Sequence, residues 1–301
     1  MQIHRVSFVA SLLFGALALS FLPAAQAQTT YRYTKIDPPN STLTAARGVN
    51  AHGDIFGGYI DADGVGHDFL LRDGVFTNIE YPSDVSAGAL AMNARGDIAG
   101  NLGDADGSHG FLLSNGVLTK VDYPGAVWTS VFAINNSGDV TGQFGTPAGK
   151  VRSFILRNGV FHGIRVSVGD NFARGAEDNG RVFVGDVVLD SDLTVHGFLQ
   201  GTGSVQLLDP PGMIVPCSHA RGINERGDVV GAFAIVSSND ECDARPPAHG
   251  FVRFQTGEYA IIDPPGSFDT FLFGINDDGV VVGAATDKDG NTHGFRAMPK
   301  D

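Results

Sequence analysis

Four histidines in this chain are each followed, thirteen or fourteen residues later, by a carboxylate. The pairs are His67 with Glu80, His109 with Asp122, His196 with Asp209, and His249 with Asp263. A histidine beside a carboxylate is the arrangement used in general acid–base catalysis. It is also the arrangement of a hydrogen bond that clamps one strand to the next. Because the pair recurs several times in one chain, we favour the structural clamp.

A tight-turn signal stands between the histidine and the carboxylate. Asp73-Gly74 and Asn115-Gly116 are dipeptides typical of type I′ hairpins, and Asn158-Gly159, Thr202-Gly203 and Thr256-Gly257 follow at equivalent positions. In such a hairpin, residues equally distant from the turn face each other on one side of the sheet. Each histidine is therefore predicted to face its carboxylate. A fifth pair, His293 with Asp37, is predicted if the N-terminal segment pairs with the last strand.

Three short segments read Asp-x-Asp-Gly. Their aspartates are Asp61 and Asp63, Asp104 and Asp106, and Asp287 and Asp289. Calcium prefers several carboxylate oxygens, so these segments are calcium candidates. An EF-type loop also needs a distal glutamate and more ligands than a short hairpin offers. We therefore favour turn formation as the role of these aspartates, and no other metal or cofactor is expected.

All of these residues belong to a unit that recurs six times. Each copy reads approximately G-I-N-x-x-G-D-V-V-G, then a variable loop, then H-G-F-L-L-x-N-G-V-F and I-D-Y-P-G. The phenylalanine of H-G-F stands at Phe69, Phe111, Phe154, Phe198, Phe251 and Phe295. Apart from one unit that carries an insertion, the spacing is 42 to 44 residues. A period of this size is typical of propellers and repeat arrays.

Turn signals divide each unit into four short strands. The N-x-x-G segment suits a type I turn between the first and second strands, and the type I′ signal joins the third and fourth. Four antiparallel strands in about 43 residues make one propeller blade. We therefore predict an all-β, six-bladed β-propeller of four-stranded antiparallel blades. The last unit ends after its third strand, so residues 31–37 are expected to supply the fourth and close the ring.

At the triplets H-G-F and G-I-N and at I-D-Y-P-G, the chain resembles the HAF-repeat family of extracellular bacterial proteins, named for a related His-Ala-Phe triplet. The likeness covers nearly the whole chain beyond residue 27. It implies secretion and a repeat fold without an established activity. Three units depart from the pattern, at His67-Asp68-Phe69, at Arg152-Ser153-Phe154 and at Glu177.

Residues 1–27 are typical of a secretory signal peptide. His4 and Arg5 precede an apolar run over 8–22, and Ala25-Gln26-Ala27 is a cleavage signal. The run is shorter than the roughly 20 residues that span a bilayer. We expect one propeller domain over 28–301, without a membrane span, secreted to the extracellular space or to the periplasm and cell envelope. The formal net charge of −13 disfavours nucleic acid as a partner.

The chain has two cysteines, Cys217 and Cys242. In a propeller, the segments that carry them emerge on the same rim, so we predict a disulfide between them. That rim would also gather the proline-rich connections, the Asp-x-Asp-Gly loops and the insertion over 237–248. Binding residues are expected there. The candidates are Trp128, Phe268, His219, Asp240, Glu241 and Arg245.

These observations favour a secreted, monomeric binding or scaffold module for an extracellular glycan or protein. A propeller enzyme, a hydrolase or lyase acting on an extracellular polymer, is the alternative. A structural repeat protein without a dedicated ligand is a third possibility. The sequence contains no G-x-S-x-G, H-E-x-x-H or C-x-x-C signature and no phosphate-binding glycine loop, so no catalytic residue is assigned. Fold analogy does not choose among the three.

Overall fold

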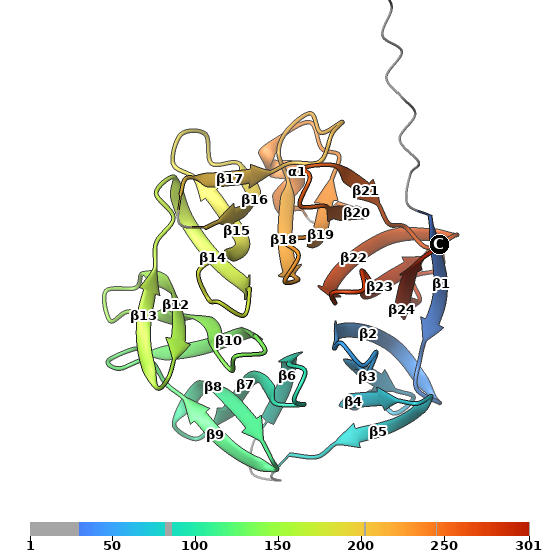
Figure 1. Ribbon diagram of the computed structural model, residues 1–301, viewed down its shortest axis with the longest axis horizontal. Coiled ribbons are helices and arrows are strands. Elements are labelled where there is room, and N and C mark those ends of the chain that lie inside the picture. Colours follow the sequence, from blue (N-terminus) through green and yellow to red (C-terminus); the bar gives the residue numbers. More distant parts are fainter. Residues whose placement is uncertain (1–29, 82–85, 202, 245, 301) are drawn as a thin grey trace, which may run out of the picture.

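The computed structural model describes residues 30–81, 86–201, 203–244 and 246–300. The predicted signal peptide, residues 1–27, lies outside these ranges. Within them the chain folds into short strands and one helix, α1 (Asn239–Asp243). The strands form antiparallel blades around a central axis, so the protein is a β-propeller (Figure 1). No helix in the described ranges is both long and apolar enough to cross a membrane.

Four sheets have four strands each, paired in chain order. They comprise β6 (Ser86–Met92), β7 (Ile98–Asp104), β8 (Gly107–Ser114) and β9 (Val117–Val121); β10 (Trp128–Ile134), β11 (Val140–Gly145), β12 (Val151–Arg157) and β13 (Val160–Ile164); β14 (Gly169–Ala176), β15 (Phe183–Leu189), β16 (Val195–Gln200) and β17 (Val205–Leu208); and β18 (Ser218–Ile223), β19 (Val229–Ala234), β20 (Ala248–Arg253) and β21 (Tyr259–Ile261). The four-stranded antiparallel blade predicted from the repeat is confirmed in these sheets.

The remaining eight strands form one sheet. This differs from the prediction, in which all six units form separate four-stranded blades. The eight strands are β1 (Tyr31–Ile36), β2 (Ser41–Val49), β3 (Ile55–Asp61), β4 (Gly66–Arg72), β5 (Val75–Ile79), β22 (Ser267–Ile275), β23 (Val281–Asp287) and β24 (Thr292–Pro299). The strands of the first and last units join because Leu43 of β2 pairs with Thr292 of β24 in a parallel bridge. β1 pairs antiparallel with β24, and Lys35 lies opposite Phe295.

A glycine of the second strand lies directly opposite the H-G-F phenylalanine of the third strand in every unit. The pairs are Gly57–Phe69, Gly100–Phe111, Gly142–Phe154, Gly185–Phe198, Gly231–Phe251 and Gly283–Phe295. All six phenylalanines are 3% exposed or less. A Cβ on Gly142 would lie 2.8 Å from the Phe154 ring and would also meet the carbonyl oxygen of Ser130. The repeated glycine therefore makes room for the buried ring.

The turns on one rim follow the sequence prediction. In the N-x-x-G turns the glycine has positive φ and its N–H donates to the asparagine carbonyl, at 3.1 Å from Gly53 to Asn50. Asp73 and Gly74 both have positive φ, as a type I′ turn requires. Thr256-Gly257 stands in a longer loop, because the Gly257 N–H donates to the Phe254 carbonyl and the Phe254 N–H donates to Glu258. Thr202 lies outside the described residues.

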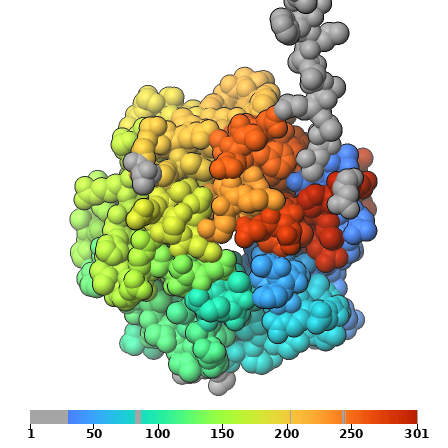
Figure 2. All heavy atoms as spheres, in the orientation of Figure 1, coloured from blue at the N-terminus to red at the C-terminus, as the bar shows by residue number. Residues whose placement is uncertain are grey.

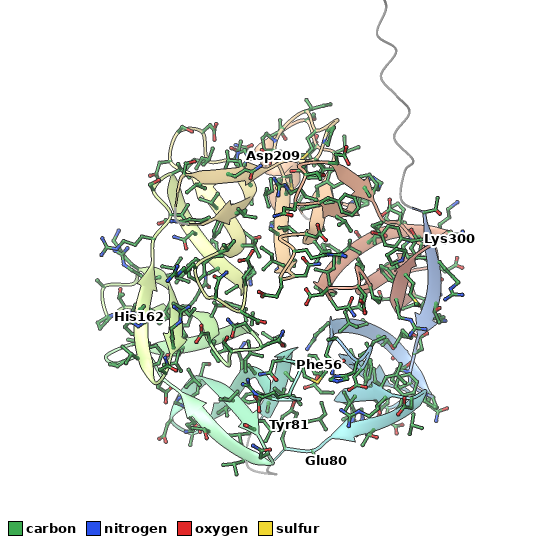
Figure 3. The ribbon with its side chains drawn as sticks, viewed as in Figure 1. Phe56, Glu80, Tyr81, His162, Asp209 and Lys300 are labelled. Carbon is green, nitrogen blue, oxygen red and sulfur yellow. A yellow bond between two sulfur atoms is a disulfide. The ribbon has the colours of Figure 1, made fainter. Side chains whose placement is uncertain are left out.

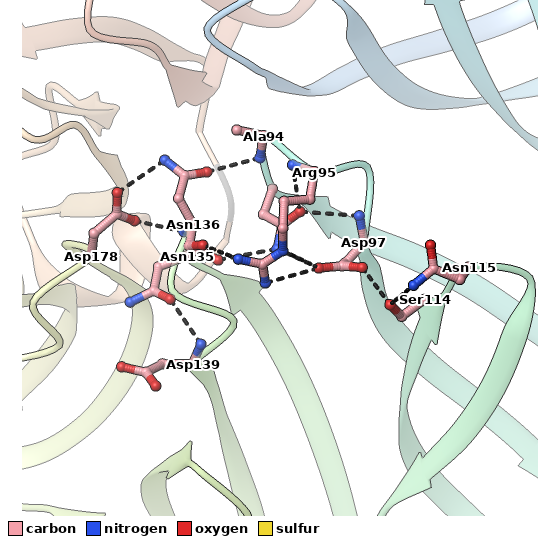
Figure 4. Close-up of polar contacts among 10 residues, drawn as sticks. Ala94, Arg95, Asp97, Ser114, Asn115, Asn135, Asn136, Asp139 and Asp178 are labelled. Atoms are coloured by element: carbon pink, nitrogen blue, oxygen red, sulfur yellow. Dashed lines mark hydrogen bonds and ion pairs between the residues drawn. The ribbon is translucent and has the colours of Figure 1, made fainter.

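Neighbouring units are tied together on this rim by a series of side-chain to backbone hydrogen bonds (Figure 4). The Ala94 N–H donates to the Asn136 side chain at 2.8 Å, and the Asn136 N–H donates to Asp178 at 2.6 Å. Asp178 then donates to Glu225, and Glu225 to Asp277, each through its backbone N–H. A cavity of about 130 Å³ lies at the axis, lined by residues of all six units. Figure 2 shows the narrow opening at the centre of the ring.

We expect Gly142→Ala to lower the free energy of unfolding by about 2 to 3 kcal/mol, because the added methyl group overpacks the site under Phe154. Gly163→Ala in the same sheet is the matched control, since nothing lies within 4 Å of its would-be Cβ. Urea unfolding of both variants measures the difference. Equal midpoints for the two variants would contradict the space-making role of the glycine.

Candidate functional site

The candidate site lies on the rim opposite the N-x-x-G turns. We define the loop rim as the edge of the ring formed by the loops between second and third strands and by the connections from one unit to the next. It includes 61–66, 122–128, 190–195 and 235–248. Two large cavities open on this rim, one between the first and second units and one beneath the disulfide.

The predicted disulfide is confirmed. Cys217 and Cys242 are bonded, with their Cα atoms 5.8 Å apart. The bond ties the segment before β18 to α1, which lies in the insertion. Cys217 is buried and packs with Ala234 and Val236. The insertion is thereby held down over the inner strands of its own unit.

The disulfide cavity is the space beneath this bond, with a volume of about 610 Å³. His219 and Arg221 of β18 line it on one side, and Asp269 and Phe271 of β22 line it on the other. Pro246 of the insertion also lines it. The cavity is therefore built from two adjacent inner strands and from the segment that is unique to the fifth unit.

A group of charged side chains lies beside this cavity. Asp186 of β15 is 5% exposed, and its carboxylate accepts a hydrogen bond from Arg174 Nε at 3.2 Å. His219 Nδ1 lies 3.4 Å from the other oxygen of Asp186, longer than a well-formed hydrogen bond. Burial raises the pKa of Asp186, but the His219 ring and the charges of Arg221 and Arg174 together bring it below its usual value.

The arginines reach this place through a feature common to all inner strands. β2, β6, β10, β14, β18 and β22 surround the axis (Figure 1), and each has a β-bulge at the same repeat position. The bulged residues are Arg47, Leu90, Phe132, Arg174, Arg221 and Phe273. A bulge re-aims the side chain of its extra residue. The Arg174 guanidinium lies 4.5 Å from the centre of the Phe132 ring, on the neighbouring inner strand.

Sequence reasoning missed Asp186, Arg174 and Arg221. The available signal was a position three residues before the repeat asparagine, where arginine stands in three units and apolar residues in the others. Asp186 follows the second-strand glycine, at a position that carries another residue type in most units. Neither pattern resembles a known motif.

The other predicted rim residues do not gather into one site. Phe268 is 58% exposed and Asp240 is exposed, whereas the Trp128 indole packs over Gly145. Glu241 accepts hydrogen bonds from the backbone N–H and the hydroxyl of Ser237, which lower its pKa. Glu241 therefore serves the local turn. Arg245 lies outside the described residues.

Four of the five predicted histidine–carboxylate contacts are present. The Nδ1 atoms lie 2.7 to 2.9 Å from a carboxylate oxygen in the pairs His109–Asp122, His196–Asp209, His249–Asp263 and His293–Asp37. A second contact was not predicted. His109 Nε2 also lies 3.3 Å from Asp104, and His196 Nε2 lies 2.7 Å from Thr194. The imidazole ring thus connects the residue that follows the fourth strand to the segment that precedes the third strand.

The prediction that His67 contacts Glu80 is wrong. His67 Nε2 lies 2.8 Å from Asp61, and its ring stacks on Tyr59 with 4.9 Å between the ring centres. Tyr59 therefore holds the imidazole toward the loop, away from the fourth strand. Glu80 is exposed just after β5, near the outer edge of the ring (Figure 3).

The first aspartates of the three Asp-x-Asp-Gly loops accept hydrogen bonds from their own turns. Asp61 accepts the N–H groups of Asp63 and Val65, both at 2.9 Å. Asp104 accepts from Asp106, and Asp287 from Asp289, in the same way. Lys120, followed by the Asp106 N–H, lowers the pKa of Asp104 to about 2. Within the described ranges, no group of three or more histidine, cysteine or acidic side chains is placed to hold a metal ion.

The first-unit cavity has a volume of about 680 Å³ and lies between β2–β5 and β6. Its lining includes Arg47, Asp68, Glu80 and Tyr81. Asp68 replaces the glycine of H-G-F and is buried, where it accepts hydrogen bonds from the Tyr81 hydroxyl at 2.9 Å and from the Ala89 N–H at 2.7 Å. Burial, followed by the charge of Asp68, raises the pKa of Tyr81.

No protein-family model and no curated protein matches the chain. Similar solved structures include a putative TolB from Agrobacterium tumefaciens (TM-score 0.57, 12% identity, 91% of this chain and 99% of that one). XC5397, a gluconolactonase from Xanthomonas campestris, has a TM-score of 0.53 at 11% identity over 92% of this chain and 93% of its own. The chain spans 65% of TolB from Acinetobacter baumannii, at a TM-score of 0.49 and 13% identity over 88% of this chain. At 11% and 12% identity, the likeness to the Agrobacterium and Xanthomonas proteins shows the propeller fold alone.

We expect His109→Ala to lower the free energy of unfolding by about 1 kcal/mol, a typical net value for an intramolecular hydrogen bond. The substitution removes contacts to both Asp122 and Asp104. His162→Ala is the control, because His162 is an exposed histidine on an outer strand (Figure 3). Thermal unfolding reports the effect, and an unchanged melting temperature for His109→Ala would argue against a clamp.

Replacing both cysteines, by Cys217→Ser with Cys242→Ser, is expected to cost about 3 kcal/mol, because the bond closes a loop of 25 residues. Chemical denaturation compares the double variant with the oxidised protein. The reduced wild-type chain is the control and should match the variant. Two free thiols in the non-reduced protein, seen by mass spectrometry, would contradict the disulfide.

Proposed function

We propose that the protein is a secreted binding module that holds an extracellular glycan, or a protein, on its loop rim. The observation that carries the proposal is the placement of the first-unit cavity, of about 680 Å³, and the disulfide cavity, of about 610 Å³. Each opens on the loop rim and combines charged side chains with an aromatic ring, Arg47 with Tyr81 in one and Arg221 with Phe271 in the other. Concave sites with a few polar groups among apolar ones are the usual form of ligand sites.

The opposite rim is a poor binding surface because its groups already have partners. The N-x-x-G asparagines cap their own turns, and Asn276 also donates to the Asn50 carbonyl of the adjacent unit at 3.0 Å. Carboxylates there accept backbone N–H groups. At this rim, residues of the repeat motif form hydrogen bonds within and between the units. The irregular segments of the units lie at the loop rim.

The proposal includes a ring of six blades. The eight-stranded sheet contains two antiparallel sets, β2 to β5 and β22 to β24 with β1, joined by the single Leu43–Thr292 bridge. We count these sets as two blades, so that β1 completes the last blade and closes the ring. Membership of the HAF-repeat family, export by the segment over 1–27 and a monomeric state belong to the same proposal. The disulfide favours an oxidising compartment.

A propeller enzyme remains the second candidate because of the first-unit cavity. Asp68 and Glu80 place two carboxyl groups in its lining, next to Arg47 and Tyr81. A pair of carboxyl groups in one cavity is the arrangement that hydrolysis of a glycosidic bond uses. In this reading the exposed Glu80 is the residue to test.

The two functions are separated by applying the chain 28–301 to a glycan array, with and without calcium, beside a panel of polysaccharide and ester substrates. We expect retention on the array without turnover. Phe268→Ser on the loop rim should weaken retention several-fold, whereas Val160→Ser, an equally exposed apolar residue by the opposite rim, should not. Turnover that Glu80→Gln abolishes would favour the enzyme. If the chain is not retained on the array and turns over no substrate, both proposed functions are contradicted.

A further inference from the structure

The disulfide cavity is lined by an arginine, Arg221, that contacts no carboxylate within the described part of the chain. Arg221 lines the cavity, yet its Nε has no hydrogen-bond partner and no carboxylate of the described residues lies within 4 Å of it. Asp186 is the nearest compensating charge, and its carboxylate is bonded to Arg174. A largely buried cation without a partner is costly, so the site is built for a ligand that supplies one.

The charges around the cavity are balanced in number but separated in space. Arg174 and Arg221 bring two positive charges, and the carboxylates of Asp186 and Asp269 bring two negative ones. Burial lowers the pKa of Arg221, Asp186 opposes this shift, and Arg174 adds to it. Asp269 is committed to the Ala248 N–H, at 2.7 Å, on the far side of the cavity. Arg221 is thus the lining residue that offers a positive charge to a ligand.

His219 lines the cavity beside Arg221, and its Nδ1 faces Asp186 Oδ1 at 3.4 Å. A carboxylate matches the guanidinium fork of an arginine and can accept from an imidazole as well. Arg221 and His219 come from the same strand, two residues apart, so one group can reach both.

The remainder of the lining limits what can carry the carboxylate. Phe233 and Phe271 present ring surfaces, Pro246 adds an apolar wall, and the second oxygen of Asp269 is an acceptor for a hydroxyl group. The volume of about 610 Å³ has room for more than a small free anion. Ring surfaces for a sugar face, an acceptor for its hydroxyl groups and a cation for its carboxylate describe a sugar acid.

We propose that the disulfide cavity binds the carboxylate of a hexuronate unit in an acidic glycan, with Arg221 and His219 holding the carboxylate. The inference rests on the proposed glycan-binding function and names its substrate class. The insertion over 237–248 is then the wall that makes this unit different from the other five, and the disulfide keeps that wall in place.

Isothermal titration calorimetry of the chain 28–301 tests the proposal with three probes: a galacturonate tetramer, the neutral galactose tetramer and sodium sulfate. The acidic tetramer should bind at least tenfold more tightly than the other two. Arg221→Met should weaken its binding at least tenfold. Arg32→Met is the matched control, because Arg32 is an exposed arginine on β1, opposite Met298. It should leave the affinity unchanged.

Equal binding of the two tetramers, or full affinity in Arg221→Met, would overturn the hexuronate site while leaving glycan binding intact. Sulfate binding as tight as that of the acidic tetramer would reduce the site to one for a free anion, which also overturns it. If no glycan binds, on the array or here, the proposed function fails with the inference. Should Arg221→Met lose the circular dichroism spectrum of the folded chain, His219→Gln provides the same comparison at a less buried residue.

Discussion

The contact between a glycine on the second strand and a phenylalanine on the third holds every unit in its shape. The phenylalanine is at most 3% exposed in every unit, and in five of the six units a Cβ on the facing glycine would lie 3.1 Å or less from the phenylalanine ring. Both members are needed at once, since a larger residue at the glycine position would meet the ring and the backbone of the first strand. The contact sets the register of the middle pair of strands, and the turns on either side then follow. Repetition of this pair supplies six of the 41 glycines, and turns with positive φ supply many of the others.

A frame built this way constrains some positions and leaves others free. The turn asparagines, the glycines and the phenylalanines recur because the packing of each unit requires them. The bulged residue of the inner strand faces the neighbouring units, so it varies among arginine, leucine and phenylalanine. The loops of the loop rim vary for the same reason. The fifth unit departs furthest from the repeat, through its insertion and its disulfide.

Much of the frame was predictable because it is local. Two-residue turns fix the register, so that His109 and Asp122 could be paired from their numbers alone. The same arithmetic failed for His67, because Tyr59 offers a stacking surface that the repeat pattern does not reveal. The disulfide followed from the rim on which its two segments emerge.

The charged group beside the disulfide cavity was not predictable, because it forms between units. Arg174 and Asp186 come from the fourth unit, and His219 and Arg221 come from the fifth. Their approach depends on how closely two inner strands pack, and no single repeat encodes that distance. The partial closure of the first and last units into one sheet has the same origin, a bridge between strands of different units.

The central claim is that this frame leaves Arg221, in the lining of the disulfide cavity, without a carboxylate of the described chain in contact with it. Crystals of the protein soaked in bromide test it most directly, because the anomalous signal locates bound anions without reference to any ligand. The account predicts a bromide peak in contact with Arg221 and His219, at higher occupancy than those at surface arginines. Peaks confined to the surface, with a protein carboxylate found against Arg221, would contradict it.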